Sequence, residues 1–210
     1  MLLPLLDDEF LGLNAAIALA KNGRKEALPV IIDGMKSYDD YEGNILNADC
    51  FKSFGMEGKA ALIQLLDYDN QDTQIALAGI LSQLKAVEAR DKVASIYNDK
   101  SLSFRYKEKR LVKALLLLGA DPFPMLVERS QEISDLNIEE IINDKEASEA
   151  AYNLLEQHLS TEKDSLKAAH YLLMLESTGS SRALDIIKKW TPHDEKYLKL
   201  TEKVIYCLSK

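Results

Sequence analysis

Apolar side chains along this chain return every three or four residues, the spacing that places them on one face of an α-helix. These helical stretches come in pairs, since a first stretch ends at a short turn and a second one begins a few residues later. The turns fall at Gly23, Gly55, Leu84–Lys85, Gly119, Asn143–Asp144 and Gly179. Gaps of roughly 25 to 35 residues between successive turns are typical of a repeat array with two helices in each repeat.

The pattern predicts about six helix pairs and a final, unpaired helix. The expected pairs are Leu13–Lys21 with Lys25–Lys36, Tyr41–Phe54 with Gly58–Leu66, Asp72–Leu84 with Val87–Tyr97, Phe104–Leu118 with Pro122–Ser130, Ile138–Ile142 with Glu146–Leu159, and Asp164–Leu175 with Ser181–Trp190. The final helix, Glu195–Leu208, is expected to cap the end of the stack. Because no linker-like stretch divides the chain, we expect a single domain over residues 1–210 that can bend near 131–143, where the period is disturbed.

Particular residues predict the buried stripes of these helices. The expected stripes are Leu13, Ile17 and Ala20 in the first helix, Leu28, Ile31, Ile32 and Met35 in the second, and Ile75, Leu77, Ala78 and Leu81 in the fifth.

Other residues predict where helices begin and end. Gly119 is expected to end one helix in the left-handed conformation, and Asp121 with Pro122 is expected to begin the next. Asp72 is the expected N-cap of the fifth helix. The segment Thr161–Asp164 has the spacing of a capping box.

Several segments resemble HEAT repeats, with the short repeats of bilin-lyase-type proteins as the nearest kind. Ala15–Gly23, Ala76–Leu84 and Ala114–Gly119 are similar to first helices, and Lys59–Leu66 and Arg182–Lys188 to second helices. The proline of longer HEAT repeats and a regular Asp and Arg ladder are absent. Tetratricopeptide repeats share a 34-residue unit, but their Trp-Leu-Gly-Tyr pattern is missing. The resemblance implies an all-α fold, an α-α superhelix or HEAT-like α-solenoid, whose concave surface mostly binds partner proteins.

Composition narrows the classes of partner. The chain has 210 residues, a net charge of −8 and a pI near 5.0. Nucleic-acid binding and attraction to anionic membranes both require basic surfaces, so neither is expected. No apolar run approaches the length that spans a bilayer. Two widely separated cysteines, Cys50 and Cys207, fit a reducing compartment, and we expect buried, inert thiols in a cytoplasmic protein.

Motifs for metals and cofactors are weak, and no cofactor is expected. A calcium loop beginning at Asp67 would need Gly and Glu where Asp72 and Ala78 stand. The three histidines, His158, His170 and His193, lack a His or Cys neighbour at helical spacing, so packing between helices is expected rather than zinc binding.

One basic segment stands out in this acidic chain. The candidate partner-binding residues are Arg105, Tyr106, Lys107, Lys109 and Arg110. Cationic and aromatic side chains in alternation can clamp a phosphate, a nucleic-acid strand or an acidic peptide. In the alternative interpretation, Phe104, Leu111 and Leu115 pack inward and the charges are simply solvated.

These observations favour a non-catalytic protein-binding or scaffold module over an enzyme. One alternative is an acidic inhibitor or immunity-type protein that covers a basic partner. The other is an enzyme of HEAT-like fold, similar to a bilin lyase or to a DNA glycosylase.

Overall fold

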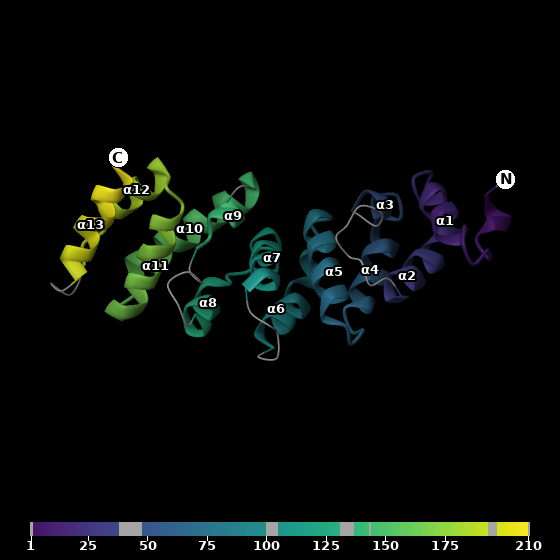
Figure 1. Cartoon of the computed structure of the whole chain (residues 1–210), viewed down its shortest axis with the longest axis horizontal. Coiled ribbons are helices and arrows are strands. Elements are labelled where there is room, and N and C mark those ends of the chain that lie inside the picture. The colour runs from purple at the N-terminus through teal and green to yellow at the C-terminus, as the bar shows by residue number, and fades with distance from the viewer. Residues whose placement is uncertain are drawn as a thin grey trace. The chain divides into compact units, whose positions relative to one another are not determined.

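Helices make up the regular structure of this protein (Figure 1). The computed structural model describes residues 2–37, 48–99, 105–130, 137–142, 144–192 and 197–209. Within these ranges it contains thirteen α-helices, three short 3-10 helices and no strand. The all-α class expected from the hydrophobic spacing is therefore confirmed. None of the helices in the described ranges combines the length and the apolar character needed to cross a membrane.

The chain separates into two compact units, Met1–Ser103 and Phe104–Lys210. Unit 1 contains η1 (Leu3–Leu5), α1 (Gly12–Ala20), η2 (Lys25–Ala27), α2 (Leu28–Ser37), α3 (Ala48–Lys52), α4 (Gly55–Leu65), α5 (Gln71–Gln83), η3 (Val87–Ala89) and α6 (Arg90–Asn98). Unit 2 contains α7 (Arg105–Leu117), α8 (Phe123–Arg129), α9 (Glu139–Ile142), α10 (Lys145–Thr161), α11 (Ser165–Ser177), α12 (Ser181–Lys189) and α13 (Leu198–Leu208). The single-domain organisation and the bend near 131–143 stay predictions, and residues 131–136 and 143 lie outside the described ranges.

Within unit 1, helices pack against the next helix and the next but one along the chain. Helix α1 contacts α2 and α3, α2 contacts α4, and α3 contacts α5. The buried side of α1 is formed by small residues around Ala16 and Ala20, whereas Leu13 and Ile17 are only half-buried. The expected stripe was therefore wrong for those two residues, because the buried side of α1 is formed by Gly12, Ala15, Ala16, Leu19 and Ala20 instead.

The expected stripes of the other two helices hold better. In α2, Leu28, Ile31 and Met35 are buried while Ile32 is half-buried. All four positions predicted for α5 are buried, as are Thr73, Ala76, Ile80 and Ser82 of the same helix. Helix α5 is thus covered on most of its surface, as expected for a helix that is apolar on most sides.

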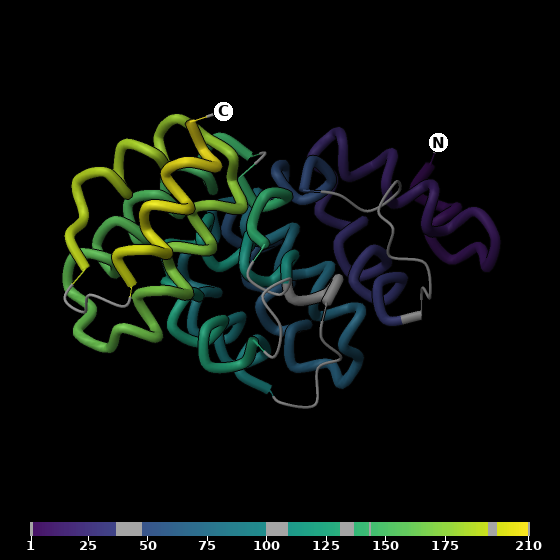
Figure 2. The backbone as a smooth tube through the Cα atoms, turned by 60° about the vertical axis from the view of Figure 1, so that its left-hand side comes forward, coloured from purple at the N-terminus to yellow at the C-terminus, as the bar shows by residue number. Residues whose placement is uncertain are grey.

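Helices in unit 2 also pack against the next helix and the next but one, with two contacts that reach three helices along the chain. Helices α11, α12 and α13 contact one another, and α10 contacts both α11 and α12 (Figure 2). Helix α7 contacts α9 but also α10, and α8 contacts α11. Helix α9 has only four residues, and the seventeen-residue α10 makes the more extensive contact with α7.

Three helices end in the same hydrogen-bonded motif, at Gly23, Lys85 and Gly119. These residues have φ of +69°, +52° and +77°. Each donates its own N–H to the carbonyl three residues back at 2.8–3.1 Å, and the next N–H bonds the carbonyl five residues back at 2.9–3.1 Å. This pair of bonds is the Schellman motif. Gly55 and Gly179 also have positive φ, so five of the six expected turns are confirmed; the sixth includes Asn143, which lies outside the described residues.

The helix N-caps correct two predictions. The N-cap of α5 is Asn70, whose side chain accepts the Thr73 N–H at 3.0 Å, and Asp72 instead lies in the first turn. Asp164 is itself the N-cap of α11, and Thr161 is the last residue of α10. Both predictions failed by two or three residues, because Asn and Asp serve equally well as caps and the neighbouring polar residues offered more than one start.

Candidate functional site

The basic segment singled out in the sequence begins helix α7. The side chains of Arg105, Tyr106 and Lys107 lie outside the described residues, as does Phe104. Farther along the helix Leu111 and Leu115 are each about 1% exposed. The expectation that these two leucines pack inward is confirmed, and it fixes which side of α7 faces the core of unit 2.

Two lysines of α7 are held by carboxylates of unit 2. Lys109 Nζ lies 3.4 Å from Glu140 Oε2 on α9, and Lys113 Nζ lies 3.3 Å from Asp144 Oδ2 at the start of α10. Residues four apart share one face of a helix, so this face of α7 points toward α9 and α10. Lys109 therefore forms a contact inside the unit, whereas Arg110 is exposed. Of the candidate residues whose side chains are described, Arg110 is thus the one still available to a partner.

Asp144 links this face to the start of α10. Its Oδ1 accepts the backbone N–H groups of Glu146 and Ala147 at 3.0 and 3.1 Å. The N–H of Ala147, followed by the nearby Lys113 ammonium, lowers the pKa of this carboxyl below its ordinary value. One carboxylate thus caps α10 and pairs with α7, so the charges here have a clear structural role.

A second polar cluster joins three elements of unit 2. His158 Nε2 on α10 lies 2.6 Å from Asp121 Oδ2, while Asp121 Oδ1 accepts the Phe123 N–H at 3.1 Å at the start of α8. The imidazole stacks on the Tyr171 ring of α11, with centroids 4.7 Å apart and an interplanar angle of 11°. These contacts support the expectation that His158 packs between helices. The sequence did not reveal its partner, which lies 37 residues away.

Tyr171 stays protonated in this cluster at neutral pH. Burial raises its pKa to about 12, and the carboxylates of Glu162, Asp121 and Glu128 act in the same direction. A phenol with so high a pKa is a poor general base. The His158–Asp121 pair orients an imidazole, as catalytic pairs do, but here both residues serve contacts that hold α8, α10 and α11 together.

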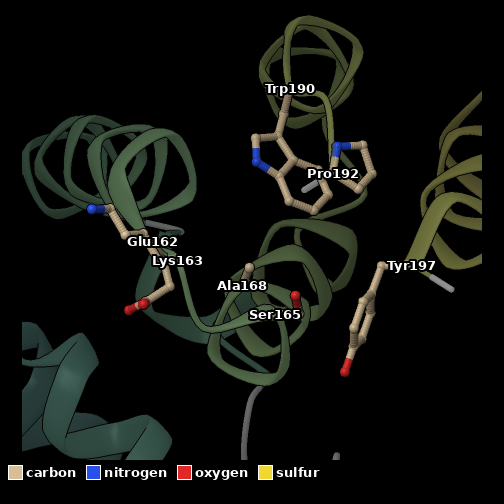
Figure 3. A pocket seen from close by; sticks show the side chains of 7 residues that line it. All are labelled: Glu162, Lys163, Ser165, Ala168, Trp190, Pro192 and Tyr197. Carbon is tan, nitrogen blue, oxygen red and sulfur yellow. The ribbon is translucent and has the colours of Figure 1, made fainter. Parts of the chain in front are cut away.

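A small pocket lies where α11 approaches the segment between α12 and α13 (Figure 3). It is a shallow hollow, open to solvent, with room for little more than a water molecule, and it is lined by Glu162, Lys163, Ser165, Ala168, Trp190, Pro192 and Tyr197. The indole of Trp190 lies beside the Pro192 ring, and Ser165 and Ala168 form the opposite wall (Figure 3). Trp190 Nε1 is buried with no hydrogen-bond partner among the described residues.

The two cysteines differ from each other. Cys50 is buried, as expected, whereas Cys207 is exposed. The buried positions of α13 are Thr201 and Val204. Cys207 lies one turn beyond them, near the end of the helix, where the described elements do not cover it. The expectation of a buried thiol was therefore wrong for Cys207.

The acidic segment considered as a calcium loop has a different partner. Both carboxylate oxygens of Asp67 lie 2.7–2.8 Å from Lys92 Nζ on α6, which also donates to the Ile63 carbonyl at 3.1 Å. Asp67 therefore connects the end of α4 to α6. In the described ranges, no three His, Cys, Asp or Glu side chains are grouped so as to hold a metal ion.

Comparison with known families and proteins gives no match: no family model and no curated protein sequence matches this chain.

Proposed function

We propose that this protein is a non-catalytic protein-binding or scaffold module, built as a HEAT-like α-solenoid of about six helix pairs with α13 as the terminal cap. The observation that carries the proposal is the spacing of the left-handed residues. Gly23, Gly55, Lys85 and Gly119 follow one another at intervals of 32, 30 and 34 residues. A turn that recurs with this period supports one structural unit repeated along the chain.

Polar contacts across the helices have nearly the same spacing. Lys25 bonds Glu57 at 32 residues' separation, and the Tyr68 hydroxyl donates to the Lys36 carbonyl at the same separation. In unit 2, Arg182 bonds Glu149 at 33 residues' separation. Repeats that contact their immediate neighbours produce contacts of this kind. Such arrays bind partners over broad surfaces rather than in a single deep pocket.

The first test is capture of the tagged full chain from its native lysate after nuclease treatment, followed by titration with the purified partner. A partner protein in stoichiometric amount that rebinds when purified supports the proposal. Recovery of nucleic acid, or of no protein, contradicts it.

Variants then test the surface on α7. We expect charge reversal at Arg105, Lys107 and Arg110 to weaken the binding of an acidic partner. Lys109 is retained because it pairs with Glu140. The matched control reverses Lys188 and Lys189, which are exposed at the end of α12. Equal affinities for both variants and the wild type would remove α7 from the binding surface.

The acidic inhibitor remains the second candidate, because the net charge of −8 favours a basic partner. This candidate predicts a fast association that slows steeply as salt is raised. A scaffold that binds through apolar contacts predicts a much weaker salt dependence, so the same titration at low and high salt separates the two.

A further inference from the structure

Phe10 is presented to solvent by a firmly held turn. It is 84% exposed, the highest value among the large apolar side chains of the described residues. Asp8 Oδ1 accepts the N–H groups of Phe10 and Leu11 at 3.0 and 2.8 Å, and the Asp8 carbonyl accepts the Gly12 N–H at 2.8 Å. These three bonds fix the backbone on both sides of Phe10.

Close packing between the segment after η1 and the start of α1 also holds this turn in place. A Cβ at Gly12 would lie 2.8 Å from the Leu6 carbonyl oxygen, so the two segments are packed as closely as a glycine allows. A side chain on a backbone already ordered loses less entropy when a partner covers it. Phe10 therefore has the properties of an interface anchor rather than those of a loosely attached surface residue.

Exposed apolar and acidic side chains lie close to this anchor in the sequence. Leu11 is 49% exposed, and Leu2 and Leu3 are 39% and 37% exposed. Asp7 and Glu9 precede Phe10 in the sequence and are also exposed. The first twenty residues contain these two acids and Asp8 but no Lys, Arg or His. The segment thus combines exposed apolar side chains with negative charge.

We infer that residues 7–11, together with Leu2 and Leu3, form a docking surface for a basic protein, in which an apolar pocket rimmed by Lys or Arg receives Phe10. This inference rests on the proposed protein-binding function and names the class of partner. A second copy of the chain fits poorly, because a two-fold contact would place Asp7 and Glu9 against their own copies. An anionic membrane repels the same carboxylates.

The test uses the full chain as bait for a phage-displayed random peptide library. We expect the selected peptides to carry Lys or Arg next to apolar residues. Synthetic copies should bind Phe10→Ala at least about tenfold more weakly than the wild type. The matched control is Met56→Ala in the same unit, which removes a side chain that is 73% exposed and should change the affinity by less than about twofold.

Charge is tested separately with Asp7→Asn combined with Glu9→Gln. This variant should bind more weakly at low salt, and the difference from the wild type should fade at high salt. Circular dichroism and thermal unfolding verify that each variant is folded. The inference is overturned if no peptide is enriched, if the peptides are acidic, or if they bind Phe10→Ala as well as the wild type. A partner captured from lysate that binds Phe10→Ala normally would leave the proposed function standing and remove this surface alone.

Discussion

The three Schellman motifs allow a test in which related substitutions should change the free energy of unfolding in opposite directions. Gly119 has a φ of +77°, where an L-residue with a Cβ is strained by about 1–2 kcal/mol. Replacing it by Ala also restricts the unfolded chain, which stabilises the folded state by about 0.4–1 kcal/mol and offsets part of the strain. No atom lies within 4 Å of the position of the new Cβ, so steric clash adds nothing. Gly119→Ala should therefore lower the free energy of unfolding by about 1 kcal/mol.

Lys85 occupies the equivalent place at the end of α5, with a φ of +52°. Lys85→Gly relieves the same strain but makes the unfolded chain more flexible, so it should stabilise the protein by about 0.5–1 kcal/mol. Gly79 serves as the control. It lies inside α5, and an added Cβ there also meets no atom within 4 Å. Gly79→Ala should stabilise by about 0.5–1 kcal/mol through helix propensity.

Urea unfolding followed by far-UV circular dichroism measures all three variants. For a slope of about 2 kcal/mol/M, each kcal/mol moves the midpoint by about 0.5 M. The expected order of midpoints places Gly119→Ala below the wild type and the other two above it. If Gly119→Ala and Gly79→Ala move the midpoint in the same direction, or if Lys85→Gly lowers it, the assignment of strain to the left-handed positions is wrong.

Three further substitutions test contacts described above. Asp144→Ala should lower the free energy of unfolding by about 1 kcal/mol at neutral pH through loss of the α10 cap. Because the pKa of Asp144 is lowered in the folded protein, the extra stability of the wild type is present above the ordinary carboxyl pKa. In urea unfolding it should vanish as the pH falls through the lowered pKa of the folded state. An unchanged difference in strong acid would refute this account. Arg182→Lys replaces the bidentate guanidinium contact with Glu149 by a single ammonium contact and loses the bond to Asn153. It should lower the thermal midpoint by about 1–2 °C, less at high salt. A decrease that salt leaves unaltered would point to packing instead. Gly12→Ala forces a Cβ against the Leu6 carbonyl oxygen and should cost about 1–3 kcal/mol by calorimetry; a neutral result would show that η1 is free to move.

Much of the fold could be predicted because it is encoded locally. A glycine that ends a helix, such as Gly23 or Gly119, acts through its own backbone and leaves a clear mark in the sequence. The left-handed residue of the third turn is a lysine, and its place was still predicted, since the apolar runs on both sides of Leu84–Lys85 stop there. The cap of α5 was missed because Asn70 and Asp72 carry equivalent side-chain acceptors two residues apart.

The candidate surfaces were harder to predict, because they depend on residues far apart in sequence. Lys109 belonged to a basic run in the sequence, yet its charge pairs with Glu140 on another helix. The contact between His158 and Asp121 spans 37 residues and two intervening helices. Phe10 gave no periodic signal, since its exposure follows from hydrogen bonds of the turn around Asp8 rather than from a hydrophobic stripe. Periodicity predicts what is buried in a helix; it does not predict what a turn presents to solvent.

The spacing of the polar contacts has a consequence for synthesis of the chain. A link such as Lys25 to Glu57, or Arg182 to Glu149, requires only about thirty residues to have emerged beyond its first partner. Contacts of such limited separation close small loops, which costs little chain entropy and favours rapid folding. Helices near the N-terminus can therefore reach their final packing while the later ones are still being translated. Chains arrested on the ribosome after α4 would already protect the amides of α1 and α2 from hydrogen exchange.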